Sequence, residues 1–200
     1  MPVELPKEIR HLARQGVFRA RDLAAIGIPR YRLKQLVEGG ALRKTGRGLY
    51  FSQSADITEN HSLVQLAARS PKAVVCLLTA LRFHGLTTEN PEVIYILLPK
   101  GVKRPRITSP LLDITWASGE SYTQGIEEHI MGGVTVKITS PAKTVADCFK
   151  YRSKVGIAVA AEALRDAWQK KKVSSEALWQ AAKVCRMTNI MRPYFDMLVT

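Results

Sequence analysis

The sequence predicts an α+β protein in two parts. Residues 1–54 are expected to form a winged helix-turn-helix, and residues 55–200 a mixed domain with a small β-sheet and several helices. Three observations predict this. The first part follows the order helix, helix, glycine turn, basic helix, basic hairpin. Apolar runs rich in β-branched residues then recur at strand length, and the tail is Ala-rich with helical spacing.

Three helices are expected in the first part, over residues 4–15, over residues 21–26, and from Pro29 to the glycine pair 39–40. Leu5, Ile9 and Leu12 have helical spacing. Gly27 permits the left-handed turn that often ends a helix. Pro29 suits the first helical position, because its missing N–H would have no partner there.

The third helix has two different faces when it is wound at about 100° per residue. Its apolar stripe consists of Pro29, Leu33, Leu36 and Val37. The opposite side carries Tyr31, Lys34 and Gln35, with Arg30 and Arg32 on the flanks. The stripe can therefore anchor the helix while long polar side chains face outward.

A basic hairpin is expected directly after the third helix. Leu42 and residues 49–51 are strand-like, and Thr45-Gly46 predicts the turn between them. The cations near its tip are Arg43, Lys44 and Arg47.

Positive charge is concentrated in the first part. The chain has a formal net charge of +13. Residues 1–54 hold eleven Lys and Arg against four Asp and Glu, a net +7, and the other 146 residues carry the remaining +6. An excess of this size favours a polyanionic partner.

This arrangement favours double-stranded DNA as the partner. A helix with long polar side chains can enter the major groove, where Arg pairs with guanine and Gln with adenine. Hairpin cations can contact phosphates or the minor groove. Winged helices also serve as protein-interaction modules, and a basic helix can be a solvated face, but the basic hairpin favours DNA. Contacts are expected from Arg30, Tyr31, Arg32, Lys34, Gln35, Arg43, Lys44 and Arg47.

The larger domain is expected to begin with two helices. Capping-box spacing at Asp56–Glu59 predicts a helix to about Arg69 that buries Leu63, Val64, Leu66 and Ala67. A second apolar helix is expected over Ala73–His84, stopped by Gly85. Strands are then expected over residues 92–98, 111–116 and 134–138, with a turn at 131–133.

The rest of the chain is expected to be helical. Ser140-Pro141 is a strong helix start, with a hydroxyl cap and proline at the first position, and this helix should reach about Tyr151. Further helices are expected over residues 155–170, after a cap at Ser174, and beyond a break at Pro193.

No motif for catalysis or cofactor binding stands out. The four histidines are scattered, and the phosphate-binding glycine patterns and the GxSxG motif are absent. Glu127 and Glu128, if helical, would point about 100° apart and could not act as an acid/base pair. Cys76, Cys148 and Cys185 stand far apart among apolar neighbours, which predicts buried thiols rather than disulfides or zinc ligands. The protein is therefore expected to be no enzyme and to use no metal or cofactor.

Two further basic clusters each have two interpretations. Lys100, Lys103, Arg104 and Arg106 lie in a proline-punctuated loop, which is either an accessory nucleic-acid contact or a solvated loop. Residues 170–172 are three lysines at a helix end, where cations are favourable, or a second phosphate contact.

A cytoplasmic location without membrane contact is expected. The apolar runs are shorter than the roughly 20 residues of a spanning helix. The charged start of the chain lacks the apolar stretch of a signal peptide.

Four segments resemble one family, the AbiEi-type antitoxins that regulate type IV abortive-infection toxin–antitoxin systems. They are RARDLAAIGIPRYRLKQLVEGGALRKTGRGLY, CLLTALRFHGL, VIYILLPKG and VKITSPAKTVADCFKYRSKVG. They occur in the family's order, so the resemblance extends over most of the chain. The stretch SPAKTVADCF with the preceding HGL is fairly specific, whereas a winged helix is shared by many regulators.

The resemblance implies an autoregulating repressor that binds inverted repeats in its operator. It also implies an antitoxin, with the antitoxin role in the C-terminal domain, that counters a nucleotidyltransferase-like toxin without a stable complex. Two alternatives stay open, a stand-alone winged-helix regulator with no toxin partner and an enzyme that processes nucleic acid. A neighbouring toxin gene would favour the antitoxin over the first alternative, and metal-dependent cleavage would establish the second.

Overall fold

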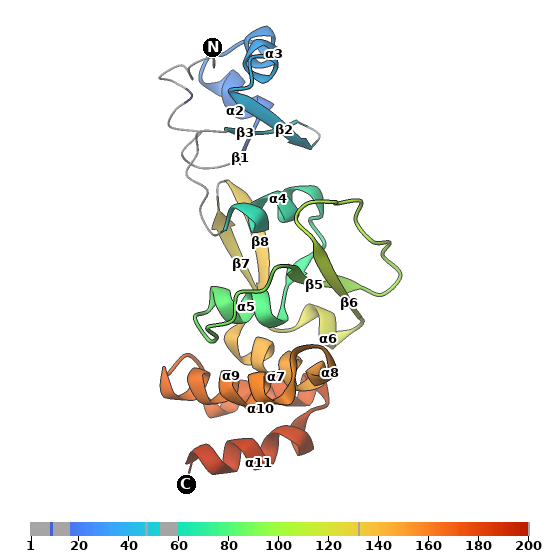
Figure 1. Cartoon of the computed structure of the whole chain (residues 1–200), viewed down its shortest axis with the longest axis vertical. Coiled ribbons are helices and arrows are strands. Elements are labelled where there is room, and N and C mark those ends of the chain that lie inside the picture. The colour runs from blue at the N-terminus through green and yellow to red at the C-terminus, as the bar shows by residue number, and fades with distance from the viewer. Residues whose placement is uncertain (1–8, 10–16, 47, 53–59, 132, 200) are drawn as a thin grey trace. The chain divides into compact units, whose positions relative to one another are not determined.

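A computed structural model of the chain describes residues 9, 17–46, 48–52, 60–131 and 133–199. The chain divides into two compact units. The first comprises residues 1–71 and 129–136, and the second comprises residues 72–128 and 137–200. Helices, a five-stranded mixed sheet and further helices follow one another along the chain, which confirms the predicted α+β class (Figure 1). The boundary predicted at residue 54 lies outside the described residues and stays a prediction.

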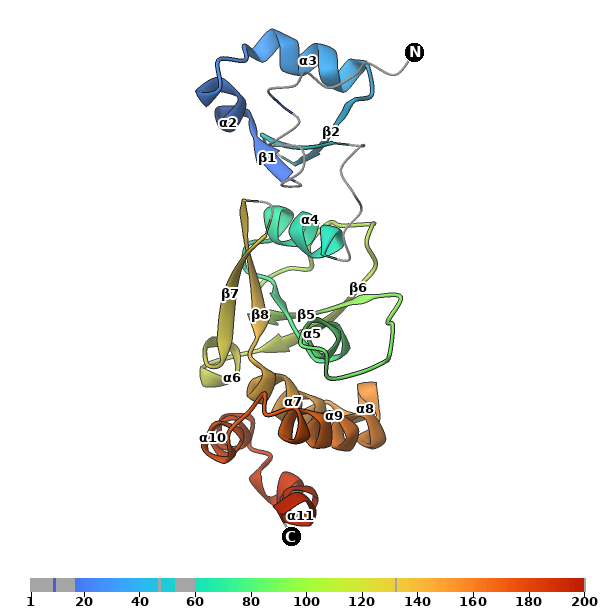
Figure 2. The same ribbon diagram turned by 90° about the vertical axis from the view of Figure 1, so that its left-hand side faces the viewer.

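The N-terminal elements are a short sheet and two helices: β1 (Val17–Arg19), α2 (Ala20–Ala25), α3 (Arg30–Glu38), β2 (Leu42–Gly46) and β3 (Leu49–Ser52). The strands are antiparallel in the order β1-β3-β2 (Figure 2). Their shared core consists of Ile9, Phe18, Leu23, Leu33, Leu36 and Leu42. Apart from the helical and buried Ile9, the helix predicted over residues 4–15 lies outside the described residues.

Two details of this region differ from the sequence prediction. Pro29 was expected at the first helical position and in the apolar stripe. It is instead the N-cap residue directly before α3 and is exposed, while Ile28 packs on the core. The hairpin does not turn at Thr45-Gly46, because the register shifts after Lys44 and Gly46 still pairs with Leu49. The described reversal therefore lies after Gly46 and before Leu49, and Gly48 there has a φ of 68°. The left-handed turn at Gly27 is confirmed, with a φ of 76°.

Helix α4 (His61–Arg69) follows, and it buries Leu63, Val64, Leu66 and Ala67 as predicted. The capping box predicted at residues 56–59 lies outside the described residues, and the described helix begins after Asn60. No helix among the described residues is long and apolar enough to cross a membrane.

The five-stranded sheet contains β4 (Val74–Val75), β5 (Ile94–Pro99), β6 (Leu112–Ala117), β7 (Ile126–Met131) and β8 (Val134–Thr139), in the order β6-β5-β4-β8-β7. Strand β4 is antiparallel to β5 and parallel to β8, and β5 is parallel to β6. The helix predicted over Ala73–His84 is therefore wrong in its first third, and only α5 (Leu77–Phe83) is helical. The backbone of Val74–Val75 pairs with strands on both sides, and both side chains are buried, which outweighs the local helical pattern.

Strand β7 was not predicted from the sequence, and it follows the short helix α6 (Glu120–Thr123). Glu127 and Glu128 therefore lie in a strand and not in a helix. Successive side chains of a strand point to opposite faces, so these two carboxylates still do not converge.

The C-terminal helices are α7 (Pro141–Lys150), α8 (Arg152–Val155), α9 (Ile157–Gln169), α10 (Ser175–Cys185) and α11 (Thr188–Val199). Both predicted caps are confirmed: Ser140 Oγ accepts from Lys143 N at 3.3 Å, and Ser174 Oγ accepts from Ala177 N at 3.1 Å. The break predicted at Pro193 is wrong, because Pro193 lies inside α11. Burial of Met191 and Phe195 on either side holds this helix together across the missing N–H.

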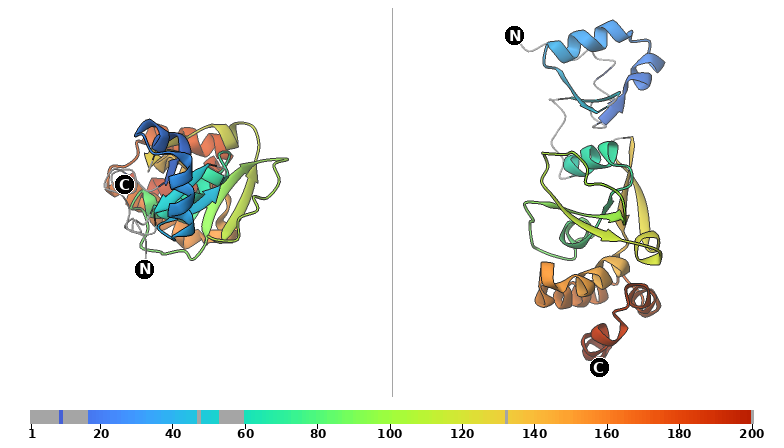
Figure 3. Two further views of the ribbon diagram at one scale, coloured as in Figure 1. Left: turned by 90° about the horizontal axis from the view of Figure 1, so that it is seen from above. Right: turned by 90° about the vertical axis from the view of Figure 1, so that its right-hand side faces the viewer.

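Helix α7 is the centre of the second unit. All eight residues from Ala142 to Phe149 are buried. It packs against α5, α9, α10 and α11, so helices surround it on several sides (Figure 3). The family-like motif SPAKTVADCF is thus the beginning and body of the central core helix.

Candidate nucleic-acid interface

Helix α3 presents the polar face that the sequence predicts. Leu33 and Leu36 are only 5% and 3% exposed and fix one side of the helix to the core. Tyr31, on the other side, is 66% exposed. The remaining predicted contact residues of this helix are also exposed: Arg30, Arg32, Lys34 and Gln35. The helix therefore offers a phenol, an amide and three cations to a partner.

The charges on α3 are placed unfavourably for the helix itself. Its first turn contains no acidic residue, yet Arg30 and Arg32 both lie there. Cations at a helix N-terminus oppose the helix dipole, which favours anions at that end. Lys34 has one weak ion pair, with Glu38 at 3.7 Å on the exposed surface. An anionic ligand would relieve this unfavourable arrangement.

The hairpin places further cations in the same unit. Arg43 and Lys44 are exposed on β2, opposite Phe51 and Tyr50 of β3. Tyr50 stacks on Phe18 with ring centroids 6.5 Å apart, which ties the hairpin to the core. Arg47 lies outside the described residues, so its predicted contact is not located.

Sequence reasoning did not single out two exposed cations on this unit, Arg19 and Arg21. Arg19 precedes α2, and its backbone N–H donates to the Asp22 carboxylate at 2.7 Å, which starts the helix. The Arg21 side chain is 75% exposed. Their signal was present in the sequence as the basic pair on either side of Ala20.

The four cations of the predicted accessory contact lie in the second unit, on the segment that joins β5 to β6: Lys100, Lys103, Arg104 and Arg106. All four are exposed. By contrast, the first lysine of the 170–172 cluster has a structural role. Lys170 Nζ donates to Asp166 at 2.7 Å and to the backbone oxygen of Gly85 at 2.9 Å.

A buried polar cluster inside α7 was missed by the sequence analysis. The side chains of Lys143 and Asp147 are each 2% exposed and form an ion pair one helical turn apart. Cys185 Sγ donates to the second carboxylate oxygen of Asp147 at 3.3 Å. Burial, the largest single effect, lowers the pKa of Lys143, but the charge and hydrogen bond of Asp147 together with the nearby Cys185 and Cys76 outweigh it, so the pKa is raised. Both charged residues were visible in the sequence at i and i+4 within an apolar helix.

The three cysteines are free and buried, as predicted. Burial raises the pKa of the Cys76 and Cys148 thiols, and burial beside Asp147 raises the pKa of Cys185 to about 12. These thiols therefore stay protonated at neutral pH and are poor nucleophiles. Within the described residues, no group of three or more His, Cys, Asp or Glu side chains could hold a metal ion.

Residues 7–52 match a protein family described as "Transcriptional regulator, AbiEi antitoxin". This match confirms the predicted resemblance over the N-terminal segment. A similar solved structure is that of the RV2827C protein from Mycobacterium tuberculosis, with a TM-score of 0.60 and 15% sequence identity. The likeness covers 90% of this chain and 72% of that one, and at this identity it establishes the fold alone. No curated protein matches the sequence.

Proposed function

We propose that this chain, whose residues 7–52 match the AbiEi antitoxin transcriptional regulator family, is a DNA-binding transcriptional repressor. In this proposal residues 1–54 form a winged helix-turn-helix, with α3 as the recognition helix and the β2–β3 hairpin as the wing. Residues 55–200 form a separate C-terminal domain. The chain works without catalysis and without a cofactor.

The observation that carries the proposal is the two-sided character of α3. Buried Leu33 and Leu36 hold the helix rigidly, while Lys34 and Gln35 extend from its opposite side. A helix fixed in this way can enter the major groove, where Gln matches adenine and cations match guanine or phosphate. Arg43, Lys44 and Arg47 of the hairpin then contact the backbone or the adjacent minor groove.

The wider role follows from the family. Such a repressor would bind an inverted repeat in the promoter of its own operon. It would also act as the antitoxin of a type IV system, against a nucleotidyltransferase-like toxin with which it forms no stable complex. A cytoplasmic location fits both roles.

Gel retardation on the duplex upstream of its own gene tests the DNA-binding proposal. Arg30→Ala/Lys34→Ala should abolish the retarded band that the unsubstituted protein gives, because two α3 contacts are lost. A matched control, Lys172→Ala/Lys183→Ala, removes two exposed cations from the second unit and should leave the band. Equal binding by both double variants would contradict the role of α3.

Co-expression with the product of the adjacent gene tests the antitoxin role. Growth should stop when that product is expressed alone and resume when this chain is present. The Arg30→Ala/Lys34→Ala variant should still restore growth if the second domain carries the antitoxin function. If the product of the adjacent gene does not stop growth when expressed alone, this role is contradicted and the stand-alone regulator remains. Purified protein should leave RNA and DNA intact in the presence of Mg²⁺ and Mn²⁺.

A further inference from the structure

The segment between β5 and β6 is a strongly cationic loop. From Val93 to Leu112 the chain has no acidic residue, and four cations lie within residues 100–106. Lys100, Lys103 and Arg104 form no ion pair with the part of the chain that is described. The acid that follows, Asp113, is already paired with Lys154.

A tryptophan is held against this loop. Trp116 lies on β6, which ends the order of the five-stranded sheet, and it is 47% exposed. Its indole N–H donates to the backbone oxygen of Val102 at 3.1 Å. The indole is thus fixed beside the cations although nearly half of its surface faces solvent.

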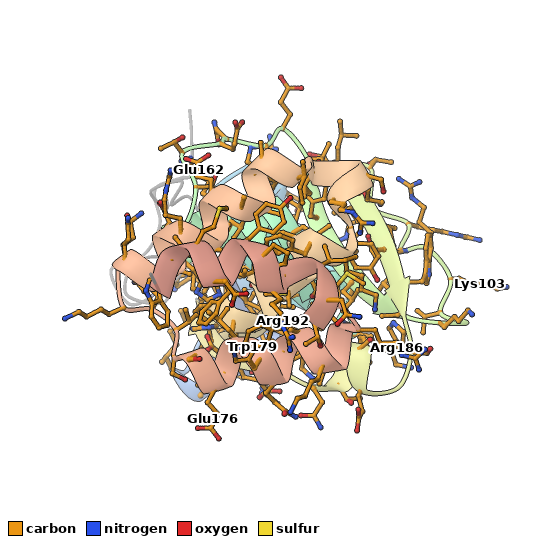
Figure 4. The ribbon with its side chains drawn as sticks, turned by 90° about the horizontal axis from the view of Figure 1, so that it is seen from below. Lys103, Glu162, Glu176, Trp179, Arg186 and Arg192 are labelled. Carbon is orange, nitrogen blue, oxygen red and sulfur yellow. The ribbon has the colours of Figure 1, made fainter. Side chains whose placement is uncertain are left out.

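The loop runs beside β6 in the opposite direction. Val102 is bonded to Trp116 near the end of the strand, whereas the Arg104 guanidinium donates to the backbone oxygen of Leu112 at its beginning, at 3.5 Å. Lys103 lies between these two attachments and projects outward from the molecule (Figure 4). Cations and indole therefore share one surface.

Neither the other two tryptophans of this unit nor the charged surface of its C-terminal helices combines these properties. Trp168 and Trp179 each pack edge-on against the buried Phe195, with ring centroids 5.2 and 5.3 Å apart. On the helices α9 to α11, Glu162 and Glu176 accompany Arg186 and Arg192 (Figure 4). That face has mixed charge, so within the described part of the second unit only the loop places cations without an ion pair, Lys100, Lys103 and Arg104, near an exposed aromatic ring.

We propose that Trp116 and the cations Lys100, Lys103 and Arg104 form a binding site for single-stranded nucleic acid, separate from α3. An unpaired base stacks on the indole, and the cations contact the phosphates on either side. Stacking on an aromatic ring needs an unpaired base, and a positively charged strip beside it follows the backbone. Nothing in this site depends on the proposed function of the first unit.

Fluorescence anisotropy with a labelled 12-nucleotide single-stranded RNA of mixed sequence tests the site. Trp116→Ala should weaken binding at least about fivefold, the lower end of what one stacked base contributes. Trp116→Phe loses the bond to Val102 but keeps an aromatic ring, so it should retain most of the affinity. Lys103→Glu, at an exposed position outside the packing, should also weaken binding and reduce its salt dependence. Lys172→Glu is the matched control and should bind with an affinity much nearer that of the unsubstituted protein.

Three results would overturn the proposal. The first is that the unsubstituted protein retards duplex DNA but does not bind the single-stranded RNA. The second is a Trp116→Phe variant as weak as Trp116→Ala, which would make the indole an anchor for the loop. The third is that poly-glutamate displaces the labelled RNA as well as unlabelled RNA of equal charge does, which would indicate an acidic protein as the partner of this surface. Loss of duplex binding alone would contradict only the proposed repressor.

Discussion

At the scale of single residues, the buried pair Lys143–Asp147 is the most demanding feature of the chain. Removing two charges from water is costly, and only their mutual attraction and the added bond from Cys185 offset this cost. A single substitution leaves the other charge buried alone. We therefore expect Lys143→Met to lower the free energy of unfolding by about 3–5 kcal/mol in urea titrations.

A double variant separates charge from packing. Lys143→Met/Asp147→Leu should lose clearly less stability than the two single variants added together, because no lone charge remains. The pair Lys154–Asp113, whose side chains are 35% and 34% exposed, is the control, and Lys154→Met should cost less than about 1 kcal/mol. Strict additivity at positions 143 and 147 would show that the pair does not act as a unit.

The same cluster predicts how stability depends on alkaline pH. Burial raises the pKa of the Cys185 thiol from its ordinary 9.0 to about 12, and the pKa of Lys143 is also raised. The folded state therefore holds protons that the unfolded chain releases. Stability should be complete below pH 9 and fall as the pH rises toward 12, by up to about 1.4 kcal/mol per pH unit for each such thiol.

Urea unfolding at pH 7.5 and pH 10.5, with a reductant present, measures this effect. Cys185→Ala should lower stability at both pH values because it leaves a cavity, but its loss between them should be smaller. A stability that stays constant up to pH 10.5 would contradict the buried, protonated thiols.

At the scale of elements, the junction between β7 and α7 depends on a glycine. Gly125 has a φ of 64°, and a Cβ atom there would lie 2.8 Å from Lys143 Cβ and 3.3 Å from Ser140 Oγ. Its backbone oxygen accepts from Ser140 N at 2.8 Å, next to the cap of α7. Gly125→Ala should cost about 1–3 kcal/mol for overpacking, in addition to about 1–2 kcal/mol for the left-handed backbone.

Thermal unfolding of two alanine variants distinguishes these costs. Gly101 also has a positive φ, of 89°, but a Cβ atom there would meet nothing within 4 Å. Gly101→Ala should therefore show only the backbone cost and a smaller decrease in Tm. Equal decreases would mean that the start of α7 yields easily to an added methyl group.

Elements with local signals could be predicted from the sequence. Ser140 and Ser174 cap helices through bonds to residues three positions ahead, so their effect is visible within a few letters. Val74–Val75 could not be assigned in this way, because its strand is defined by partners at Leu97 and Lys137. Pro193 was misread for the same reason, since tertiary burial keeps α11 continuous.

Of the two candidate sites, the one on α3 depends on local sequence and could be predicted, and the one at Trp116 depends on tertiary contacts and could not. The polar face of α3 follows from helical periodicity, and the structure places it where the sequence predicts. The site at Trp116 could not be foreseen, because Val102 and Trp116 meet only when the loop folds back along β6. Side chains that come from one helix can be grouped from sequence, whereas those joined by a loop cannot.

At the scale of the whole molecule, the charge of +13 predicts a strong dependence of binding on salt. Each phosphate contact releases condensed counterions, so log K for the operator duplex should fall with log salt by about 0.9 for each contact. Arg43→Ala/Lys44→Ala should reduce this slope by about 2 and weaken all sequences alike. Gel retardation at several salt concentrations measures both slopes, and an unchanged slope would remove the hairpin from the interface.

The loop beside β6 also bears on how copies of this protein behave when concentrated. An edge strand offers unpaired backbone groups on which a foreign strand can add, and such additions are a route to aggregation. Here β6 ends the sheet, and beside it lies a loop with exposed lysines and arginines and with Pro105 among them. Two such edges repel each other, and proline cannot donate to a new ladder. The segment that attracts a polyanion thus also keeps neighbouring sheets from joining, so the protein should remain dispersed until a polyanion neutralises the loop.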